Sequence, residues 1–220
     1  MRIVIIGGHG RVARLLAPLL VNAGHSVEAL VRRADHIDEV DAAGADARLA
    51  DLERLDTAGL AALFKGRDAV VWCVGPAIGD PERSRSVDRD AAIRSIDAAV
   101  EAGVRRYVLV SHSRTGRAPG SPGDPAGPYA EALAAADAHL RSSTLNWTIL
   151  GPGQLTDKPG GGMLEAGDHV TCGETSRANV ARVIRQVVCK DDLGGVTLNF
   201  RDGRRPIAEV LQVMTTVASG

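Results

Sequence analysis

Aromatic side chains are scarce in this chain of 220 residues, where they make up only 3% of the sequence. The six aromatic residues are Phe64, Trp72, Tyr107, Tyr129, Trp147 and Phe200. Aliphatic side chains must therefore fill the core. Proteins that bind single-stranded nucleic acids without sequence preference stack the bases on several aromatic rings. The scarcity of aromatics argues against a partner of that kind.

A surplus of charge is also missing, because 26 basic residues are balanced by 27 acidic ones. Without a positive excess, neither a nucleic acid nor a membrane surface is expected as a partner. The cysteines Cys73, Cys172 and Cys189 are odd in number and widely spaced, which is typical of neither a disulfide framework nor a zinc site. The first apolar run ends at Gly7, too early for a signal sequence or a membrane helix. Together these features predict a cytoplasmic protein.

Strand and helix patterns alternate along the chain and predict an α/β fold of the Rossmann type, a doubly wound parallel sheet with helices on both faces. The expected strands are residues 3–6, 25–32, 45–51, 68–75, 106–111, 147–150 and 195–201, and the expected helices are 11–24, 53–65, 84–103, 129–141, 176–189 and one from 206. No linker divides the pattern. We therefore expect residues 1–220 to form a single domain, in which about 151–220 contribute a small cap over the ligand side of the sheet.

A glycine-rich turn, Gly7-Gly8-His9-Gly10-Arg11-Val12-Ala13, joins the first strand to the first helix. Glycine is needed where such a turn takes a positive φ and where the backbone approaches a pyrophosphate, and a small third residue lets the helix pack on the strand. The helix N-terminus adds oriented N–H groups and the positive end of a dipole. The residues predicted to contact a dinucleotide are Gly7, Gly8, His9, Gly10, Arg11 and Val12. A tight turn with a structural role only is the alternative.

The second strand ends in Arg32 and Arg33, where an NAD-binding fold usually has an acidic residue for the ribose hydroxyls. A guanidinium pairs with a 2′-phosphate and a carboxylate repels it, so the cofactor predicted is NADP, with NAD less favoured. Arg11 is a second candidate for this phosphate. Solvated surface charge is the alternative interpretation of Arg32 and Arg33.

Further cofactor contacts are predicted from position alone, at the ends of the third and fourth strands. They are Asp51, Leu52, Val74 and Gly75. Asp51 has an alternative role as N-cap of the following helix. Loops rich in Gly, Pro and Ser at 113–128 and 151–162 are expected at the same sheet edge, where ligands bind. We expect residues 158–162 to form a mobile flap over the site, and the charged residues 84–90 to form a solvated helix face.

Several segments together resemble the NmrA-like branch of the atypical short-chain dehydrogenase/reductases. The segments that carry the resemblance are 5–10, 29–32, 50–52, 68–75, 102–111, 145–150 and 176–181. They cover nearly the whole chain, and together they are more specific than the glycine turn alone. The resemblance implies a Rossmann fold that binds NAD(P).

The resemblance also implies a catalytic centre, because the reductive members of the family use a serine after the fifth strand and a Tyr-x-x-x-Lys pair on the next helix. Ser111 and Ser113 both lie near the serine position, where Ser113 is preferred by its offset from the strand and Ser111 is a predicted cofactor contact. Tyr129 fits the tyrosine position, with packing at the edge of the crevice as its alternative role. Leu133 stands where the family has lysine. Without a nearby cation, a phenol with a pKa near 10 is a poor acid or base at neutral pH. His112 is an alternative acid or base.

The residues after the sixth strand depart from the family as well. The family often has Arg-Pro-Gly there, and this chain has Gly151-Pro152-Gly153. Pro152 remains as a predicted cofactor contact, whereas the arginine contact to a substrate or phosphate is missing.

Two classes of function follow from these observations. One is an NADP-dependent oxidoreductase that transfers a hydride to or from a small carbonyl, quinone or flavin-like substrate. The other is a non-catalytic NADP(H)-sensing protein that acts through a protein partner, which the missing lysine and arginine motivate. An isomerase or lyase that uses the nucleotide transiently is a third possibility. The chain is expected to be a monomer or a homodimer.

Overall fold

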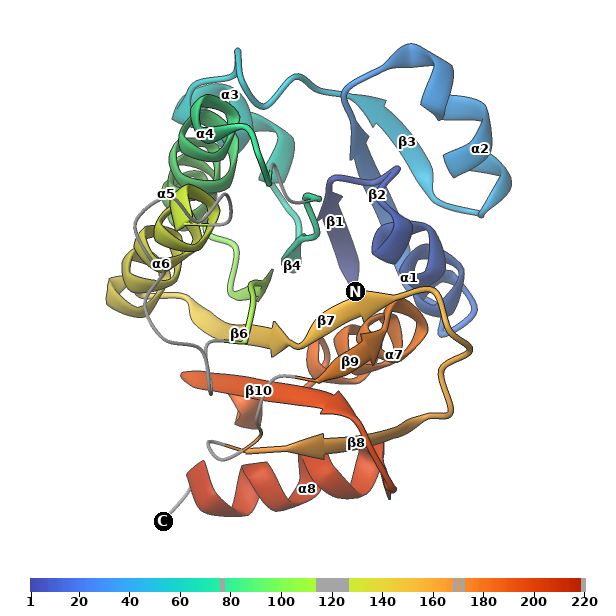
Figure 1. Ribbon diagram of the computed structural model, residues 1–220. Helices are drawn as coiled ribbons and strands as arrows, with labels where there is room; N and C mark the ends of the chain where they lie inside the picture. The colour runs from blue at the N-terminus through green and yellow to red at the C-terminus, as the bar shows by residue number, and fades with distance from the viewer. Residues whose placement is uncertain (76–77, 114–126, 168–169, 171–172, 219–220) are drawn as a thin grey trace.

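The computed structural model describes residues 1–75, 78–113, 127–167, 170 and 173–218 (Figure 1). A nine-stranded sheet crosses the molecule in the order β11-β8-β10-β6-β5-β4-β1-β2-β3. Its strands are β1 (Arg2–Ile6), β2 (Ser26–Val31), β3 (Asp46–Leu49), β4 (Ala69–Trp72), β5 (Arg106–Val110), β6 (Asn146–Pro152), β8 (Met163–Ala166), β10 (Val196–Asp202) and β11 (Arg205–Pro206). All pairs from β3 to β10 are parallel, and β8 is antiparallel to β10 and β11. This strand order confirms the predicted Rossmann-type α/β fold.

Helices cover both faces of the sheet. They are α1 (Arg11–Val21), α2 (Ile37–Ala42), α3 (Thr57–Phe64), α4 (Pro81–Arg83), α5 (Ala92–Glu101), α6 (Gly127–Ser142), α7 (Arg177–Val187) and α8 (Ile207–Ala218), with 3-10 turns at Ala34–His36 and Asp191–Leu193. Figure 1 shows α3, α5 and α6 along one face and α1 and α7 along the other. Within the part of the chain that the structure describes, no helix combines the length and apolar character needed to cross a membrane.

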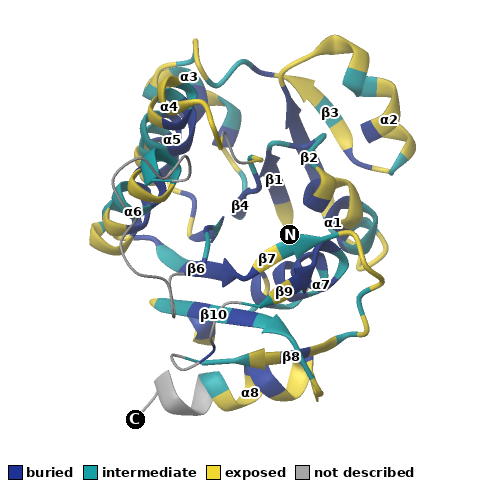
Figure 2. Ribbon diagram, in the orientation of Figure 1, coloured by how far each residue is buried: buried dark blue, intermediate teal, exposed yellow. Residues whose placement is uncertain are grey.

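The apolar run that forms β1 is buried on both faces of the sheet. Ile3 and Ile5 pack into one core cluster with residues of α1 and α7, and Val4 and Ile6 pack into a second cluster with residues of α3 and α5. Alternate side chains of a strand point to opposite faces, so a strand covered on both sides needs an unbroken apolar sequence. Figure 2 shows that β1 is largely buried, whereas the edge strand β3 is largely exposed.

The helix expected at 53–65 starts later than predicted. α3 begins at Thr57 because the side chain of Asp56 accepts a hydrogen bond from Gly59 N–H at 2.8 Å, as an N-cap residue does. Asp51 instead accepts from the Glu53 N–H at 3.1 Å, within the turn that follows β3. The alternative role of Asp51 as the N-cap of this helix is therefore wrong.

The helix expected at 84–103 starts earlier, at Pro81, and contains a π-helical segment, η2 (Ser84–Ala91). Hydrogen bonds from i to i+5 widen such a segment and change which residues share a face. Ser84 and Asp88 are each only 1% exposed. The prediction of a solvated helix face at 84–90 is therefore wrong for these two residues.

The last third of the chain contains strands that the sequence patterns did not indicate. The expected loop at 151–162 includes the end of β6 and a strand β7 (Gln154–Thr156), which pairs in parallel with β9 (Glu174–Ser176). The antiparallel strands β8 and β11 extend the main sheet beyond β10. These short strands, together with α8, form the part of the molecule expected to cap the substrate side.

Arg106 connects this last third to the centre of the sheet. Its guanidinium is buried and donates hydrogen bonds to the Asn146 carbonyl at 2.7 Å, the Thr148 hydroxyl at 2.6 Å and the Val187 carbonyl at 3.0 Å. Burial lowers the pKa of Arg106 to about 10, while the negative charge of Asp191 acts in the opposite direction. Arg106 therefore remains a cation at neutral pH and joins β5, β6 and α7.

Candidate functional site

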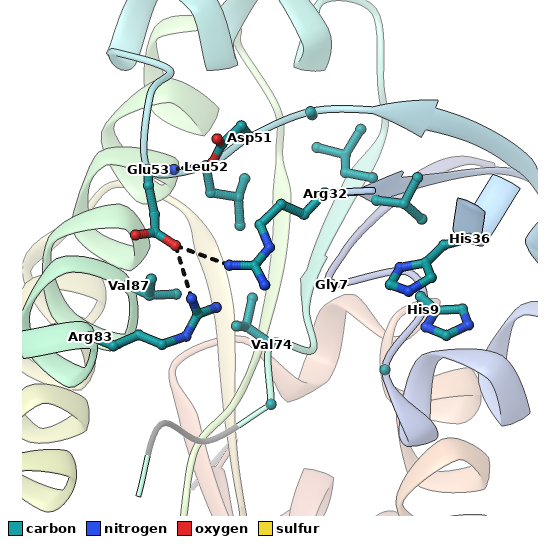
Figure 3. A pocket seen from close by; sticks show the side chains of 15 residues that line it. Gly7, His9, Arg32, His36, Asp51, Leu52, Glu53, Val74, Arg83 and Val87 are labelled. Carbon is teal, nitrogen blue, oxygen red and sulfur yellow. Dashed lines mark hydrogen bonds and ion pairs between the residues drawn. The ribbon is translucent and has the colours of Figure 1, made fainter. Parts of the chain in front are cut away.

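A cavity of about 500 Å³ opens where the strand order reverses, beyond the C-terminal ends of β1, β2 and β4 (Figure 3). In open α/β sheets this switch point is the usual ligand site. The cavity is lined by Gly7, His9, Gly10, Leu30, Val31, Arg32, His36, Ala50, Asp51, Leu52, Glu53, Val74, Gly75, Arg83 and Val87. The predicted cofactor residues among them are Gly7, His9, Gly10, Arg32, Asp51, Leu52, Val74 and Gly75. The structure thus brings together segments that are far apart in the sequence.

The glycine turn has the geometry expected of a site for a pyrophosphate. Gly7 has a φ of +82°, and a Cβ there would lie 2.9 Å from both the Cys73 carbonyl oxygen and the Val74 Cα. Gly10 is the N-cap of α1, with extended backbone and no side-chain cap among the described residues. The first N–H groups of α1 are therefore available to an anion at this end of the cavity.

Gly8 and Val12, both predicted to contact the cofactor, do not line the cavity. The Gly8 N–H donates to the Leu30 carbonyl at 2.8 Å, and a Cβ on Gly8 would lie 2.7 Å from the Cβ of Ala29. Val12 is buried in the core beneath the turn. These two residues fix the turn against β2 and the core instead of facing the cavity.

Arg32 points into the cavity from the end of β2. One of its nitrogens, Nη1, lies 3.4 Å from Glu53 Oε1, and Nη1 of Arg83 lies 3.0 Å from the same oxygen (Figure 3). Arg33 lies outside the lining and forms a two-point contact with Asp35, with distances of 2.9 Å and 2.5 Å. This contact lowers the pKa of Asp35 to about 2.

Arg11, the second candidate for the 2′-phosphate, also lies outside the cavity lining. Its Nη1 is 3.0 Å from Asp157 Oδ2, and Nη1 of Arg177 is 2.8 Å from the other oxygen of the same carboxylate. Arg32 is thus the predicted arginine that the structure places in the cavity.

His9 and His36 form one wall of the cavity. Their rings are stacked, with centroids 3.6 Å apart and planes 10° from parallel. His9 Nε2 also contacts Glu39 Oε2 at 2.7 Å, and this hydrogen bond lowers the pKa of Glu39. Sequence reasoning identified His9 through the turn motif but missed His36, because nothing in the spacing relates a residue after β2 to the turn after β1.

The segment 158–162 does not lie over the cavity. Arg182 donates from Nη1 to the Gly160 carbonyl at 2.6 Å, and the Gly162 N–H donates to Asn179 Oδ1 at 2.9 Å. Both partners belong to α7, and none of residues 158–162 lines the cavity. The structure therefore corrects the prediction of a flap over the site, because the segment is attached to the first turns of α7.

The predicted catalytic residues lie outside the cavity lining. Ser113 is 2% exposed, and its N–H donates to the Pro152 carbonyl at 3.0 Å, at the end of β6. The Ser111 hydroxyl donates to Asp137 Oδ2 at 3.1 Å. Most of the expected loop 113–128 falls outside the described residues.

Tyr129 has an anionic environment where the family has a lysine. Burial raises the pKa of Tyr129, and the carboxylates of Asp88 and Asp137 raise it further. Leu133, four residues later, is 3% exposed and packs inside the molecule. The phenol is therefore held neutral at physiological pH and can act as a hydrogen-bond donor, but not as a phenolate base.

A pH titration tests this environment. Burial also raises the pKa of Tyr107, the second of the two tyrosines, so we expect both to keep their protons well above pH 10 in the folded protein. Because the unfolded chain releases these protons near pH 10, the free energy of unfolding should fall as the pH rises above that value. Tyrosinate absorbance measures the ionisation, with Tyr129→Phe to assign the signals and denatured protein as reference. Ionisation of Tyr129 near pH 10 in the folded protein would contradict the assignment.

Comparison with known proteins assigns the chain to a family. A family model described as NAD(P)H-binding matches residues 7–191. The chain belongs to the NAD(P)H-binding family. This membership agrees with the resemblance to the atypical short-chain dehydrogenase/reductases noted above.

Several known proteins are similar to nearly the whole chain. The uncharacterized sugar epimerase YhfK of Bacillus subtilis is 32% identical over 218 residues, which cover 96% of this chain and 99% of YhfK. A Bacillus halodurans structure, provisionally named an NAD-dependent epimerase/dehydratase, has a TM-score of 0.87 at 31% identity and covers 97% of this chain and 99% of its own. The oxidoreductase ylbE of Lactococcus lactis has a TM-score of 0.87 at 25% identity, with coverage of 98% and 97%.

Proposed function

We propose that this NAD(P)H-binding protein is an NADP-dependent oxidoreductase that moves a hydride between the nicotinamide and a small carbonyl, quinone or flavin-like substrate. The observation that carries the proposal is the cavity, in which the open N-terminus of α1 and the side chain of Arg32 lie at the sheet's switch point. Dianionic phosphates are bound by such helix ends and guanidinium groups. The similarity to an oxidoreductase over nearly the whole chain supports the same reaction class.

The residues around the cavity and the predicted catalytic residues have separate roles in this reaction. The turn at residues 7–10 binds the pyrophosphate, and Arg32 binds the 2′-phosphate. When bound, the cofactor supplies or accepts the hydride. Ser113 polarises the substrate carbonyl. Tyr129 stays neutral and orients the substrate by donating a hydrogen bond to it. The proton that accompanies hydride transfer is therefore exchanged with solvent.

A second function, NADP(H) sensing without turnover, is favoured by the surroundings of Tyr129. Two carboxylates raise the pKa of this phenol, whereas a lysine would lower it, and Leu133 offers no charge. A sensor needs the cofactor cavity but no proton donor. It would bind NADP(H) with discrimination between the redox states and would recruit a protein partner in one state only.

Binding and turnover measured on the same preparation separate these functions. We expect NADPH to bind more tightly than NADH and to be oxidised in the presence of some members of a panel of quinones, aldehydes and flavins. Tight binding of NADPH without turnover on the whole panel would support the sensor. Because one relative is named a sugar epimerase, the panel includes nucleotide sugars, and their interconversion without net NADPH oxidation would replace the oxidoreductase by an epimerase. Absence of NADPH binding would overturn both the NADP-dependent oxidoreductase and the NADP(H) sensor.

A further inference from the structure

Two arginines from separate elements meet at one carboxylate oxygen in the cavity. Arg32 directly follows β2, and Arg83 is the last residue of α4, the short helix before η2. Figure 3 shows the two side chains approaching Glu53 from different elements, and their Nη1 atoms lie 3.4 Å and 3.0 Å from Glu53 Oε1. The cavity therefore contains two convergent guanidinium groups, although the strand end alone supplies one.

A phosphomonoester suits this pair of arginines better than the carboxylate does. In the structure Glu53 Oε1, which carries only part of the single negative charge of its carboxylate, contacts both guanidinium groups. A phosphomonoester carries nearly two negative charges at neutral pH and offers three acceptor oxygens, so each guanidinium can take its own oxygen. Displacement of the Glu53 carboxylate by such a group would therefore strengthen the contacts of both Arg32 and Arg83.

Glu53 can be displaced at little cost. The side chains of Glu53 and Arg83 are each 36% exposed and that of Arg32 is 52% exposed. Ion pairs with this degree of exposure contribute little to stability, because solvent screens them. The Glu53 backbone is held independently, because its N–H donates to Asp51 Oδ1 at 3.1 Å. The carboxylate can therefore swing away while the turn after β3 keeps its shape.

From this geometry we propose that Arg83 is a second ligand of the adenosine 2′-phosphate and that Glu53 is a built-in competitor for the same position. The inference rests on the proposed use of NADP. Without the cofactor, Glu53 neutralises the two arginines, and on binding the 2′-phosphate displaces it. For NAD(H), which has a free 2′-hydroxyl, the Glu53 carboxylate is instead an acceptor that stays in place. The exchange between carboxylate and phosphate thus sets the degree of discrimination between the two cofactors.

The test compares two small probes, 2′,5′-ADP and 5′-AMP, which differ by the 2′-phosphate, in equilibrium binding to the full-length protein. We expect Arg83→Gln to weaken 2′,5′-ADP about tenfold or more, the scale of one hydrogen bond between charged groups, and to leave 5′-AMP unchanged. Arg83→Lys keeps the charge without the planar fork and should fall between the wild type and Arg83→Gln. Glu53→Gln should tighten 2′,5′-ADP about fivefold, which corresponds to the loss of a surface ion pair, and should not tighten 5′-AMP.

Matched controls lie on either side of Arg83 in the sequence. Arg85→Gln and Glu82→Gln remove the same charges from exposed positions outside the cavity and should leave the ratio of the two affinities as in the wild type. Arg83→Gln should fold, because the Asp80 side chain accepts from the backbone N–H of residue 83, which the substitution keeps. Unfolding curves of all variants check this.

The outcomes distinguish this inference from the proposed function. If the wild type prefers 2′,5′-ADP and Arg83→Gln keeps that preference, or if Arg85→Gln lowers it equally, the role of Arg83 is wrong while the NADP assignment stands. If Glu53→Gln weakens 2′,5′-ADP, Glu53 is not a competitor. If the wild type binds both probes equally, the NADP assignment itself fails, and this inference fails with it.

Discussion

Replacing Gly7 with alanine is expected to lower NADPH affinity at least about tenfold and to lower the free energy of unfolding by about 2–4 kcal/mol. The backbone of Gly7 has a φ of +82°, which a side chain disfavours, and the new Cβ would lie 2.9 Å from the backbone of Cys73 and Val74. To relieve that contact the turn must move away from β4, which displaces the N-terminus of α1. Denaturant unfolding and NADPH titration measure the two effects.

Gly24→Ala is the matched control for this variant. Gly24 has nearly the same φ, +83°, but a Cβ there would meet nothing within 4 Å. This control should show the conformational cost alone, about 1–2 kcal/mol, with unchanged NADPH affinity. Equal losses of affinity in the two variants would mean that the close approach of Gly7 to β4 has no part in cofactor binding.

Arg32→Asp is expected to weaken NADPH binding by at least about 1–3 kcal/mol, the scale of a hydrogen bond between charged groups, while NADH binding is spared. The substitution removes the guanidinium that points into the cavity from β2 and puts a negative charge near the 2′-phosphate. A carboxylate at the end of the second strand can also accept from the ribose hydroxyls of NADH. Titration of both cofactors into the variant measures the change in preference.

The neighbouring residue provides the control for Arg32→Asp. Arg33→Asp makes the same change in charge one residue later, but Arg33 contacts Asp35 and does not line the cavity. We expect this variant to lose much less NADPH affinity. If the two variants weaken NADPH binding equally, the effect comes from the change in net charge near the cavity, and the assignment of Arg32 to the phosphate is wrong.

The sequence predicted the central strands well because their burial leaves a strong pattern. The run Ile3–Ile6 is apolar without interruption, and burial on both faces of a sheet requires this. The strands β8 and β11 leave no such pattern, since each is short and β11 consists of two exposed residues, Arg205 and Pro206. β8 pairs with β10 and β11 pairs with β8, so the position of each strand depends on its neighbour and not on its own composition. The π-helical segment was missed for a related reason, because its sequence does not distinguish i+4 from i+5 hydrogen bonding.

For the site, the sequence identified residues that belong to local motifs and missed those that meet only in the folded chain. The glycine turn and Arg32 were found from their positions after β1 and β2. Glu53, in the turn after β3, and Arg83, in α4, are 30 residues apart and belong to no recognisable motif, so only the topology of the sheet brings them to Arg32. The acidic surroundings of Tyr129 depend in the same way on Asp88, which the π-helical segment directs inward.

The hydrogen bonds of the buried Arg106 guanidinium affect how the chain folds while it is being synthesised. One acceptor, the Val187 carbonyl, lies 81 residues after Arg106, in α7. A buried guanidinium that lacks part of its hydrogen bonds is costly, so β5 and β6 are not expected to close firmly on the nascent chain until α7 has left the ribosome. At about 5–20 residues per second, this wait lasts on the order of 4–16 s. A ribosome-bound chain that stops before α7 should accordingly be cut by proteases within β5 and β6, and a chain that extends past α7 should resist.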